Sequence, residues 1–290
     1  MIANTLYHTS NSFLGRISVN GFSMDLFNNW TAHEFMWNYE DKVLDIGNSR
    51  GGLFYGKNGT VGGNNTIHTG LNDITSFGKV IMSEGKTAID VWSSEQANMM
   101  NGTDGSMFAP GLTRFQDLYV FAADVCRSFK MIYKKDVRAI NDNRILLYQY
   151  SGAPEQGLNA TMNPSNKGFC VKDALGPECP PAGLMDLSRC RMKDSRMIPL
   201  YASQPRFFKA DPRVYNRIKG LKPASEDDQT VLNIHPETGY PLEATKKLQF
   251  NMSSDSLDYK QVKQSGDNVD DDPDPYEASE NCIFTTTRQR

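Results

Sequence analysis

The sequence has 290 residues, of which 39% are hydrophobic and 22% are charged, and its formal net charge is −3. This composition is typical of a globular protein with a sizeable core, and it argues against a nucleic-acid binder, which normally carries a strongly basic face. No window approaches 18 consecutive apolar residues, so the sequence as given predicts no membrane-spanning helix. Its first residues also lack the basic and apolar regions of a signal peptide.

A helix is predicted over residues 31–45. Thr31 and Glu34 stand three residues apart, as in a capping box, in which each side chain accepts a hydrogen bond from the backbone amide of the other residue. Apolar residues follow at helical spacing, at Phe35, Met36, Tyr39, Val43 and Leu44. Taken alone, this pattern indicates a helix that packs on a core.

The stretch from 98 to 129 combines three features in a fixed order. The segment Asn-Gly-Thr-Asp-Gly at 101–105 predicts an exposed turn. Leu-Tyr-Val-Phe at 118–121 is a short apolar run that must be buried, and Cys-Arg-Ser follows at 126–128. We interpret the basic cluster after it as the solvated side of a helix; it consists of Lys130, Lys134, Lys135 and Arg138.

The second half of the chain reads mainly as strands. We expect strands at 144–150 and 230–234, and a turn at 235–239. The next strand, at 242–250, has the clearest period of two in the sequence and should be half-buried. One face carries Leu242, Ala244, Lys246, Leu248 and Phe250, and the other carries Glu243, Thr245, Lys247, Gln249 and Asn251.

Six asparagines lie in N-x-S/T sequons, which are more than chance predicts and favour a lumenal or extracellular chain. They are Asn29, Asn58, Asn64, Asn101, Asn159 and Asn251. Such a chain needs an entry signal, so we expect Met1 to be an internal methionine of a longer protein.

Four cysteines, at 126, 170, 179 and 190, allow three disulfide pairings, and reduced structural cysteines are the alternative. Their spacing does not match the CxxC pairs of zinc knuckles, so we predict no metal and no cofactor. The four histidines form no HExxH motif, and the sequence has no GxSxG, Walker or GxGxxG motif. The sequence therefore gives no positive support for an enzyme.

The order of Asn-Gly-Thr-Asp-Gly, Leu-Tyr-Val-Phe and Asp-Val-Cys-Arg-Ser resembles the signature of the class B scavenger receptor family, most closely its lysosomal integral membrane protein type 2 branch. TAHEFMWNYEDKVLD at 31–45, GLFYGKNGT at 52–60 and the strand at 242–250 are also similar to family segments. The resemblance covers roughly residues 28–253.

This resemblance implies an α+β, mainly β fold: an antiparallel β-barrel ectodomain core with an apical helical bundle, truncated here at both ends. We expect residues 1–254 to form the partial lumenal or extracellular ectodomain and residues 255–290 to be an acidic, disordered tail with a lone Cys282. In the family the helix corresponding to 31–45 lies at the apex, where partners dock. Candidate partner-binding residues are therefore His33, Phe35, Met36 and Tyr39.

The resemblance also implies the pairs Cys126–Cys190 and Cys170–Cys179. Many members carry a further cysteine four residues before the Asn-Gly-Thr-Asp motif, where this chain has Ala97, and Gly168 occupies the position of its partner. This chain therefore lacks both cysteines of that third bridge.

The function implied by the resemblance is that of a membrane-anchored receptor of the lysosomal or plasma membrane, whose ectodomain binds and transfers lipids such as sterol, phospholipid, fatty acid or lipoprotein. The alternative is a lysosomal trafficking receptor that carries a lysosomal hydrolase on its apical helices. His33 is then a candidate pH sensor, although an exposed helix histidine with no switching role is the simpler interpretation. A secreted hydrolase is a third, weakly supported hypothesis.

Overall fold

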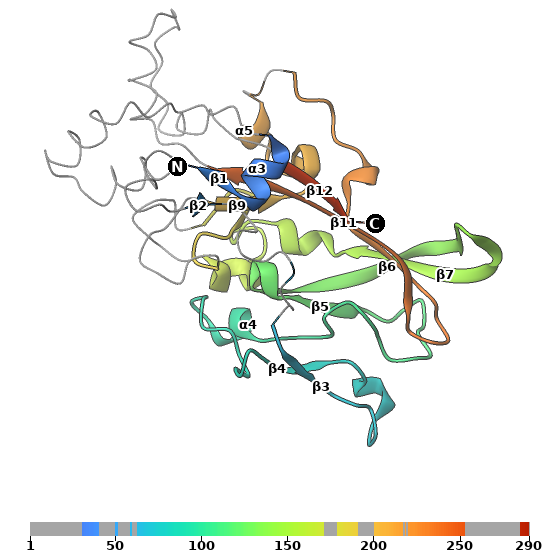
Figure 1. Ribbon diagram of the computed structural model, residues 1–290. Coiled ribbons are helices and arrows are strands. Elements are labelled where there is room, and N and C mark those ends of the chain that lie inside the picture. Colours follow the sequence, from blue (N-terminus) through green and yellow to red (C-terminus); the bar gives the residue numbers. More distant parts are fainter. Residues whose placement is uncertain are drawn as a thin grey trace, which may run out of the picture.

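The computed structural model describes residues 31–40, 50–51, 59, 63–170, 179–190, 200–216, 218, 220–252 and 285–289. One eight-stranded sheet dominates these ranges, and all its ladders are antiparallel (Figure 1). The strand order is β5-β6-β7-β10-β11-β9-β8, and β12 pairs with β11. The bounds are β5 Leu118–Ala122, β6 Arg127–Ala139, β7 Asp142–Gly152, β8 Met185–Asp186, β9 Leu200–Ser203, β10 Val231–Ile234, β11 Pro241–Met252 and β12 Thr285–Gln289.

Smaller elements surround this sheet. Two further antiparallel pairs join β1 (Tyr39–Glu40) to β2 (Arg50–Gly51) and β3 (Asn65–Ile67) to β4 (Val80–Ser83). The described α-helices are α3 (Ala32–Trp37), α4 (Glu95–Asn98) and α5 (Pro212–Tyr215). The described 3₁₀ helices are η2 (Ile74–Ser76), η3 (Ala123–Val125), η4 (Pro154–Gly157), η5 (Pro164–Phe169), η6 (Pro205–Phe207) and η7 (Glu226–Asp228).

The mainly β, antiparallel class predicted from the sequence is confirmed, whereas its finer features are not. The eight-stranded sheet is open among the described residues, because no ladder there joins its end strands β5 and β8. The described helices have at most six residues and form no bundle with one another. None of the described helices is long and apolar enough to cross a bilayer. At the far end of the chain, residues 285–289 of the expected disordered tail form β12.

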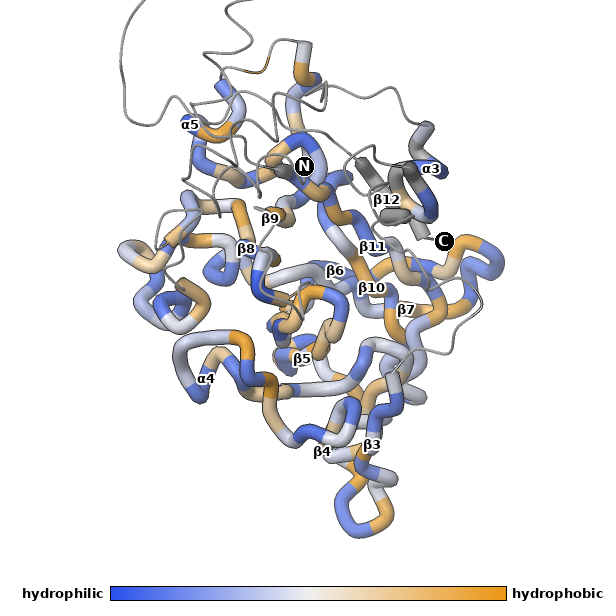
Figure 2. The backbone as a smooth tube through the Cα atoms, turned by 60° about the vertical axis from the view of Figure 1, so that its left-hand side comes forward, coloured by the Kyte–Doolittle hydropathy of each residue, from blue (hydrophilic) through white to orange (hydrophobic). Residues whose placement is uncertain are grey.

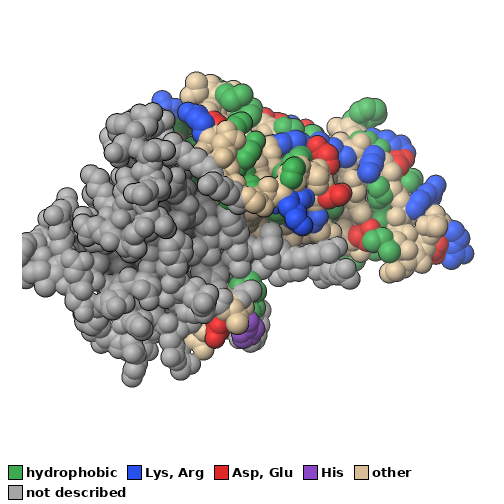
Figure 3. Space-filling model, turned by 90° about the horizontal axis from the view of Figure 1, so that it is seen from above, with side chains coloured by type: hydrophobic (Ala, Val, Ile, Leu, Met, Phe, Trp, Pro, Cys, Tyr) green, Lys and Arg blue, Asp and Glu red, His purple; other side chains and the backbone are tan. Residues whose placement is uncertain are grey.

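The basic cluster that we assigned to a helix lies instead on β6, the long strand that pairs with β7. This segment is rich in aromatic and β-branched residues, such as Phe129, Ile132 and Val137, which favour a strand. Lys134 and Lys135 are exposed on it, as expected for solvated charges. In the face shown in Figure 3, basic, acidic and hydrophobic side chains of the described residues are interspersed, with no large patch of one charge.

The turn and the strands predicted at its two sides are confirmed as β10 and β11, but the buried face of β11 differs from our expectation. Leu242 is 46% exposed, while Gln249 and Asn251, on the opposite face of the pleat, are only 3% and 2% exposed. These amides are buried because each has a partner: Gln249 Nε2 donates to Asn251 Oδ1 (2.6 Å), and Asn251 Nδ2 donates to Ser203 Oγ (3.0 Å). Hydrophobic alternation alone could not reveal this polar network.

Two hydrophobic clusters stabilise the sheet. The larger one packs the segment before β5 against β5, β6, β7 and β10 and comprises Phe108, Leu112, Leu118, Met131, Tyr148, Tyr150 and Ile234. The smaller one lies beside η3 and contains Val125, Leu187, Ala202 and Phe250. Hydrophobic and hydrophilic residues are interspersed along these strands, as expected for a pleated sheet with one buried face (Figure 2).

The Asn-Gly-Thr-Asp-Gly segment is packed against β5 and is less exposed than the sequence suggests. Thr103 is only 3% exposed and exchanges backbone hydrogen bonds with both Tyr119 and Phe121. Gly102 adopts a positive φ of 86°, and a Cβ atom placed on it would lie 1.9 Å from the Tyr119 carbonyl oxygen. Only glycine fits this approach of two backbones.

We predict that Gly102→Ala destabilises the complete chain by roughly 3 kcal/mol or more, since it adds a backbone clash to the cost of a left-handed alanine. Gly111→Ala is the matched control, because Gly111 also has a positive φ (78°) but has no neighbouring atom within 4 Å of its Cβ position. The control should cost only about 1–2 kcal/mol. Denaturant midpoints of the two variants provide the measurement, and equal losses would contradict the packing of this segment on β5.

Candidate functional site

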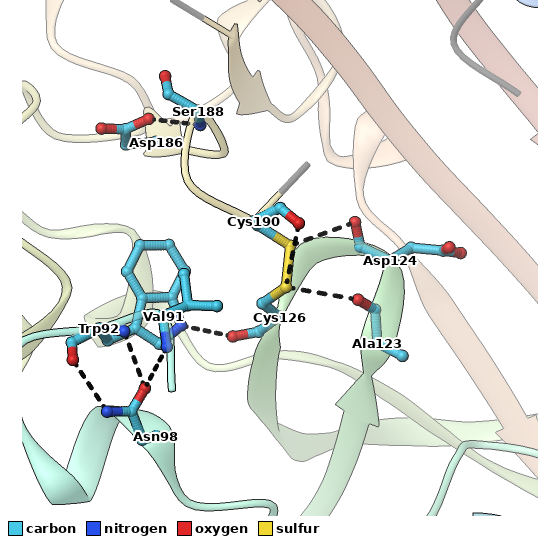
Figure 4. Close-up of a disulfide and its surroundings, with 9 residues drawn as sticks. All are labelled: Val91, Trp92, Asn98, Ala123, Asp124, Cys126, Asp186, Ser188 and Cys190. Carbon is cyan, nitrogen blue, oxygen red and sulfur yellow. Dashed lines mark hydrogen bonds between the residues drawn. A yellow bond between two sulfur atoms is a disulfide. The ribbon is translucent and has the colours of Figure 1, made fainter. Parts of the chain in front are cut away.

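A disulfide joins Cys126, at the turn between β5 and β6, to Cys190, beyond β8, with 5.7 Å between the Cα atoms (Figure 4). Cys126 ends η3 in the left-handed conformation, with φ 49° and ψ 41°. Its carbonyl oxygen accepts a hydrogen bond of 2.6 Å from Trp92 Nε1, and Asn98 holds the backbone at Trp92 through a further hydrogen bond of 2.8 Å. Three separate parts of the chain therefore hold the bridge in place: the turn at Cys126, the segment at Cys190, and the segment from Trp92 to Asn98.

A second disulfide joins Cys170, at the end of η5, to Cys179, with 4.6 Å between the Cα atoms. Both bridges match the pairing that the family resemblance implies. Close to the second one, a Cβ atom placed on Gly168 would lie 3.0 Å from the Cβ atom of Ala97 on α4. The two positions that carry the third bridge in some relatives are thus side by side here without cysteines.

A cavity of about 30 Å³ is lined in part by Cys170 of the second bridge. Three segments line it: Arg127 at the start of β6, residues 156–170 around η4 and η5, and residues 180–186 leading into β8. Because each segment begins or ends next to a bridged cysteine, the two disulfides hold the walls of this cavity together.

Arg127 is the charged side chain that lies deepest at this site. It is only 7% exposed, and its guanidinium carbon lies 3.5 Å from the centre of the Phe169 ring. No salt bridge or side-chain hydrogen bond joins it to any residue that the structure describes. Burial lowers the pKa of Arg127 to about 10, so the guanidinium stays protonated at neutral and acidic pH.

Sequence reasoning did not single out Arg127, although it quoted this residue as part of a family segment. The available signal was an arginine directly after a bridged cysteine, at the start of a strand with apolar neighbours. Its burial depends on Phe169, which lies 42 positions later, and this contact has no sequence signature.

Comparison with known proteins identifies the family. The model of the CD36 family matches residues 1–269. The chain belongs to the CD36 family. The predicted class B scavenger receptor resemblance is confirmed, and it extends beyond the segment from 28 to 253 on which we based it.

Curated CD36-family relatives are similar at about one third identity. Lysosome membrane protein 2 of Rattus norvegicus is 32% identical over 244 residues, which cover 82% of this chain and 48% of that protein, and the Homo sapiens protein is 33% identical over the same coverage. Scavenger receptor class B member 1 of Sus scrofa is 32% identical over 250 residues, covering 83% of this chain and 46% of that protein. The chain thus spans about half the length of these relatives.

The helix that we expected to form part of the CD36-family apex is present but shorter than predicted. The capping box at its start is confirmed, with 3.2 Å from the Glu34 amide to Thr31 Oγ1 and 2.7 Å from the Thr31 amide to the Glu34 carboxylate. The helix ends at Trp37 instead of 45, because Asn38 is extended and β1 follows. His33 is exposed and Met36 half-buried. The side chains of Phe35 and Tyr39 lie outside the described residues, so partner binding by this set stays a prediction.

The sequons differ sharply in accessibility. Asn64 is exposed, whereas Asn101 and Asn159 are half-buried. Asn251 is buried, and its amide nitrogen donates to Ser203 Oγ, so it is poorly placed to carry a glycan in the folded protein. The remaining two, Asn29 and Asn58, lie outside the described residues.

No group of three or more His, Cys, Asp or Glu residues that could hold a metal ion occurs in the described part of the chain.

We predict that losing Cys126–Cys190 destabilises the chain more than losing Cys170–Cys179. The first bridge closes a loop of 64 residues and the second one of 9, which correspond to about 4 and about 2.5 kcal/mol in the chain-entropy model. Double alanine variants of each pair, compared by denaturant midpoint, provide the test. A larger loss from the shorter loop would show that native packing at Cys170 and Cys179 outweighs chain entropy.

Glycopeptide mapping of the chain secreted from eukaryotic cells should find Asn64 occupied and Asn251 empty. Asn64 is open to the transferase and to a bulky glycan, whereas a sugar on Asn251 would disrupt the hydrogen bonds with Ser203 and Gln249. Occupancy at Asn251 in folded protein would mean that β11 does not pack as described.

Proposed function

We propose that this chain forms part of the ectodomain of a membrane-anchored class B scavenger receptor that binds and transfers lipids, among them sterol, phospholipid, fatty acid or lipoprotein. The observation that carries the proposal is the family match over residues 1–269. The similarity to scavenger receptor class B member 1 over 83% of the chain also supports it. The proposed role requires no bond-making chemistry.

The two disulfides support a lumenal or extracellular location, because disulfides persist in oxidising compartments. Exposed Asn64 in a sequon is compatible with that location. The relatives named lysosome membrane protein 2 favour a lysosomal membrane, while those named scavenger receptor leave the plasma membrane equally open. The proposal places this region on the lumenal or extracellular side in either case.

Within the proposal, residues 1–254 belong to the ectodomain and 255–290 form an acidic tail. The pairing of Lys246–Phe250 with β12 brings the end of that tail alongside β11. β12 lies on the same side of β11 as β10, which pairs with Pro241–Thr245 of β11.

In both roles α3 is the proposed docking surface, for lipoprotein in the first role and for a lysosomal hydrolase in the second, a trafficking receptor. Short amphipathic helices dock through a few apolar side chains. Met36 is half-buried on α3 and so retains accessible surface, next to exposed His33 and Glu34. This arrangement makes Met36 the residue at which the two roles can be separated.

We predict that Met36→Asp, in the complete membrane-anchored receptor, lowers capture of lipoprotein roughly tenfold, because a charge would replace an apolar contact at the docking surface. Met162→Asp is the matched control; Met162 is 66% exposed and lies on a different part of the chain. Cell-surface capture of labelled lipoprotein, normalised to receptor amount, provides the measurement.

The outcomes separate the proposals. Absence of lipoprotein or vesicle binding by the unmodified receptor would contradict the lipid-binding function itself. Loss of hydrolase capture with lipid binding intact would favour the trafficking role. A reduced amount of the Met36→Asp receptor at the cell surface would instead show that Met36 serves the core and that α3 is no docking surface.

A further inference from the structure

The hairpin of β3 and β4 forms an arm, residues 65–83, that projects from the main sheet in both views (Figures 1 and 2). The arm tip, residues 68–79, connects the two strands and contains η2. Leu71 is 90% exposed there, and Ile74 on η2 is 53% exposed. Large apolar side chains gathered on one exposed element commonly mark a contact surface.

Local contacts fix the conformation of the arm tip. The His68 amide donates to the Lys79 carbonyl oxygen at 2.9 Å, which closes the tip at its base. Gly70 has a positive φ of 76°, and a Cβ atom placed on it would lie only 3.0 Å from the Phe77 Cβ atom. This close approach holds the backbone on the Phe77 side chain, so the adjacent Leu71 is presented to solvent on a preformed turn.

One acidic side chain, Asp73, belongs to the arm tip. It caps η2 by accepting hydrogen bonds of 2.9 Å from the Thr75 amide and from Ser76 Oγ. Hydrogen bonds from Thr75 and Ser76 and the charge of Lys79 lower the pKa of Asp73, so its carboxylate stays ionised at neutral and mildly acidic pH. An ionised carboxylate is costly in hydrocarbon, so a tip that contacts a membrane stays at headgroup depth.

Basic side chains lie at the base of the arm tip. Lys79 and His68 are both exposed and are neighbours across the closing hydrogen bond. With Asp73 they leave the tip without net negative charge, so an anionic surface is not repelled. Basic residues next to apolar side chains are the combination by which surface segments bind anionic membranes, where burial of apolar area adds to electrostatic attraction.

We propose that the arm tip docks on a bilayer that contains anionic phospholipid. Leu71 and Ile74 enter the headgroup layer, and Lys79 contacts the lipid phosphates. The inference rests on the membrane anchoring proposed above, because a tethered receptor keeps the arm close to a bilayer and makes a small contact effective. Asn64 lies at the opposite end of β3 from the tip, so a glycan there is attached away from Leu71.

The test measures cosedimentation of the full chain, with both disulfides formed, with vesicles of phosphatidylcholine containing roughly one third phosphatidylserine. Leu71→Asp should lower the vesicle affinity at least tenfold, because it places a charge at the inserted position. The fold should tolerate this change, since Leu71 is almost fully exposed. Ile140→Asp is the matched control: Ile140 is 83% exposed at the turn between β6 and β7, and its replacement should leave the vesicle affinity unchanged.

Two further variants check the charge and the apolar contact separately. Lys79→Gln should weaken binding to the phosphatidylserine vesicles roughly fivefold and leave binding to pure phosphatidylcholine vesicles unchanged. Leu71→Met keeps an apolar side chain of similar volume and should retain the parent affinity.

Other results would overturn the docking surface. These are no vesicle binding by the parent chain, undiminished binding by Leu71→Asp, or an equal loss in Ile140→Asp. A loss of lipoprotein capture by the anchored Leu71→Asp receptor, with vesicle binding intact, would assign the tip to lipoprotein instead. Lipoprotein capture by the unmodified anchored receptor tests the proposed function separately, so the two ideas fail by different measurements.

Discussion

The Cys126–Cys190 bridge is the constraint on which this region of the molecule depends. It holds Cys126 in a left-handed conformation that costs an L-residue roughly 1–2 kcal/mol, and it does so where β5 turns into β6. The Trp92 indole then caps the Cys126 carbonyl, which connects the turn to the segment before α4. Arg127 follows directly in the chain, so this covalent and hydrogen-bonded corner also sets where its guanidinium lies.

Local chemistry made part of this structure predictable. The capping box at Thr31 and Glu34 depends on residues three positions apart, and the hairpin of β10 and β11 depends on a five-residue turn, so both were identified correctly. The length of α3 was not, because the departure of Asn38 from helical geometry is followed by pairing of β1 with β2, which is not a local interaction. The disulfide pairing came from family resemblance, since four cysteines alone permit three arrangements.

The buried polar groups show why the site itself was harder to predict. Gln249 and Asn251 appear as solvent-facing positions in an alternating pattern, yet they satisfy each other and Ser203 inside the sheet. Ser203 lies 48 positions before Asn251, so no local pattern records the pairing. Arg127 presents the same difficulty in stronger form, because a charged residue is normally assigned to the surface. Only the fold brings Phe169 and two bridged segments around it.

The two buried polar sites, the Gln249 network and Arg127, differ in the groups that surround them. In the Gln249 network the partners are supplied by the chain, so the network stabilises one packing of β9 against β11 and needs nothing further. At Arg127 the chain supplies the face of the Phe169 ring, and the cavity beside it is also lined by the carboxylate-bearing Asp186. The two disulfides fix the ends of the segments that line this cavity. The guanidinium is therefore held by contacts between segments that lie far apart in the sequence, and no local pattern records them.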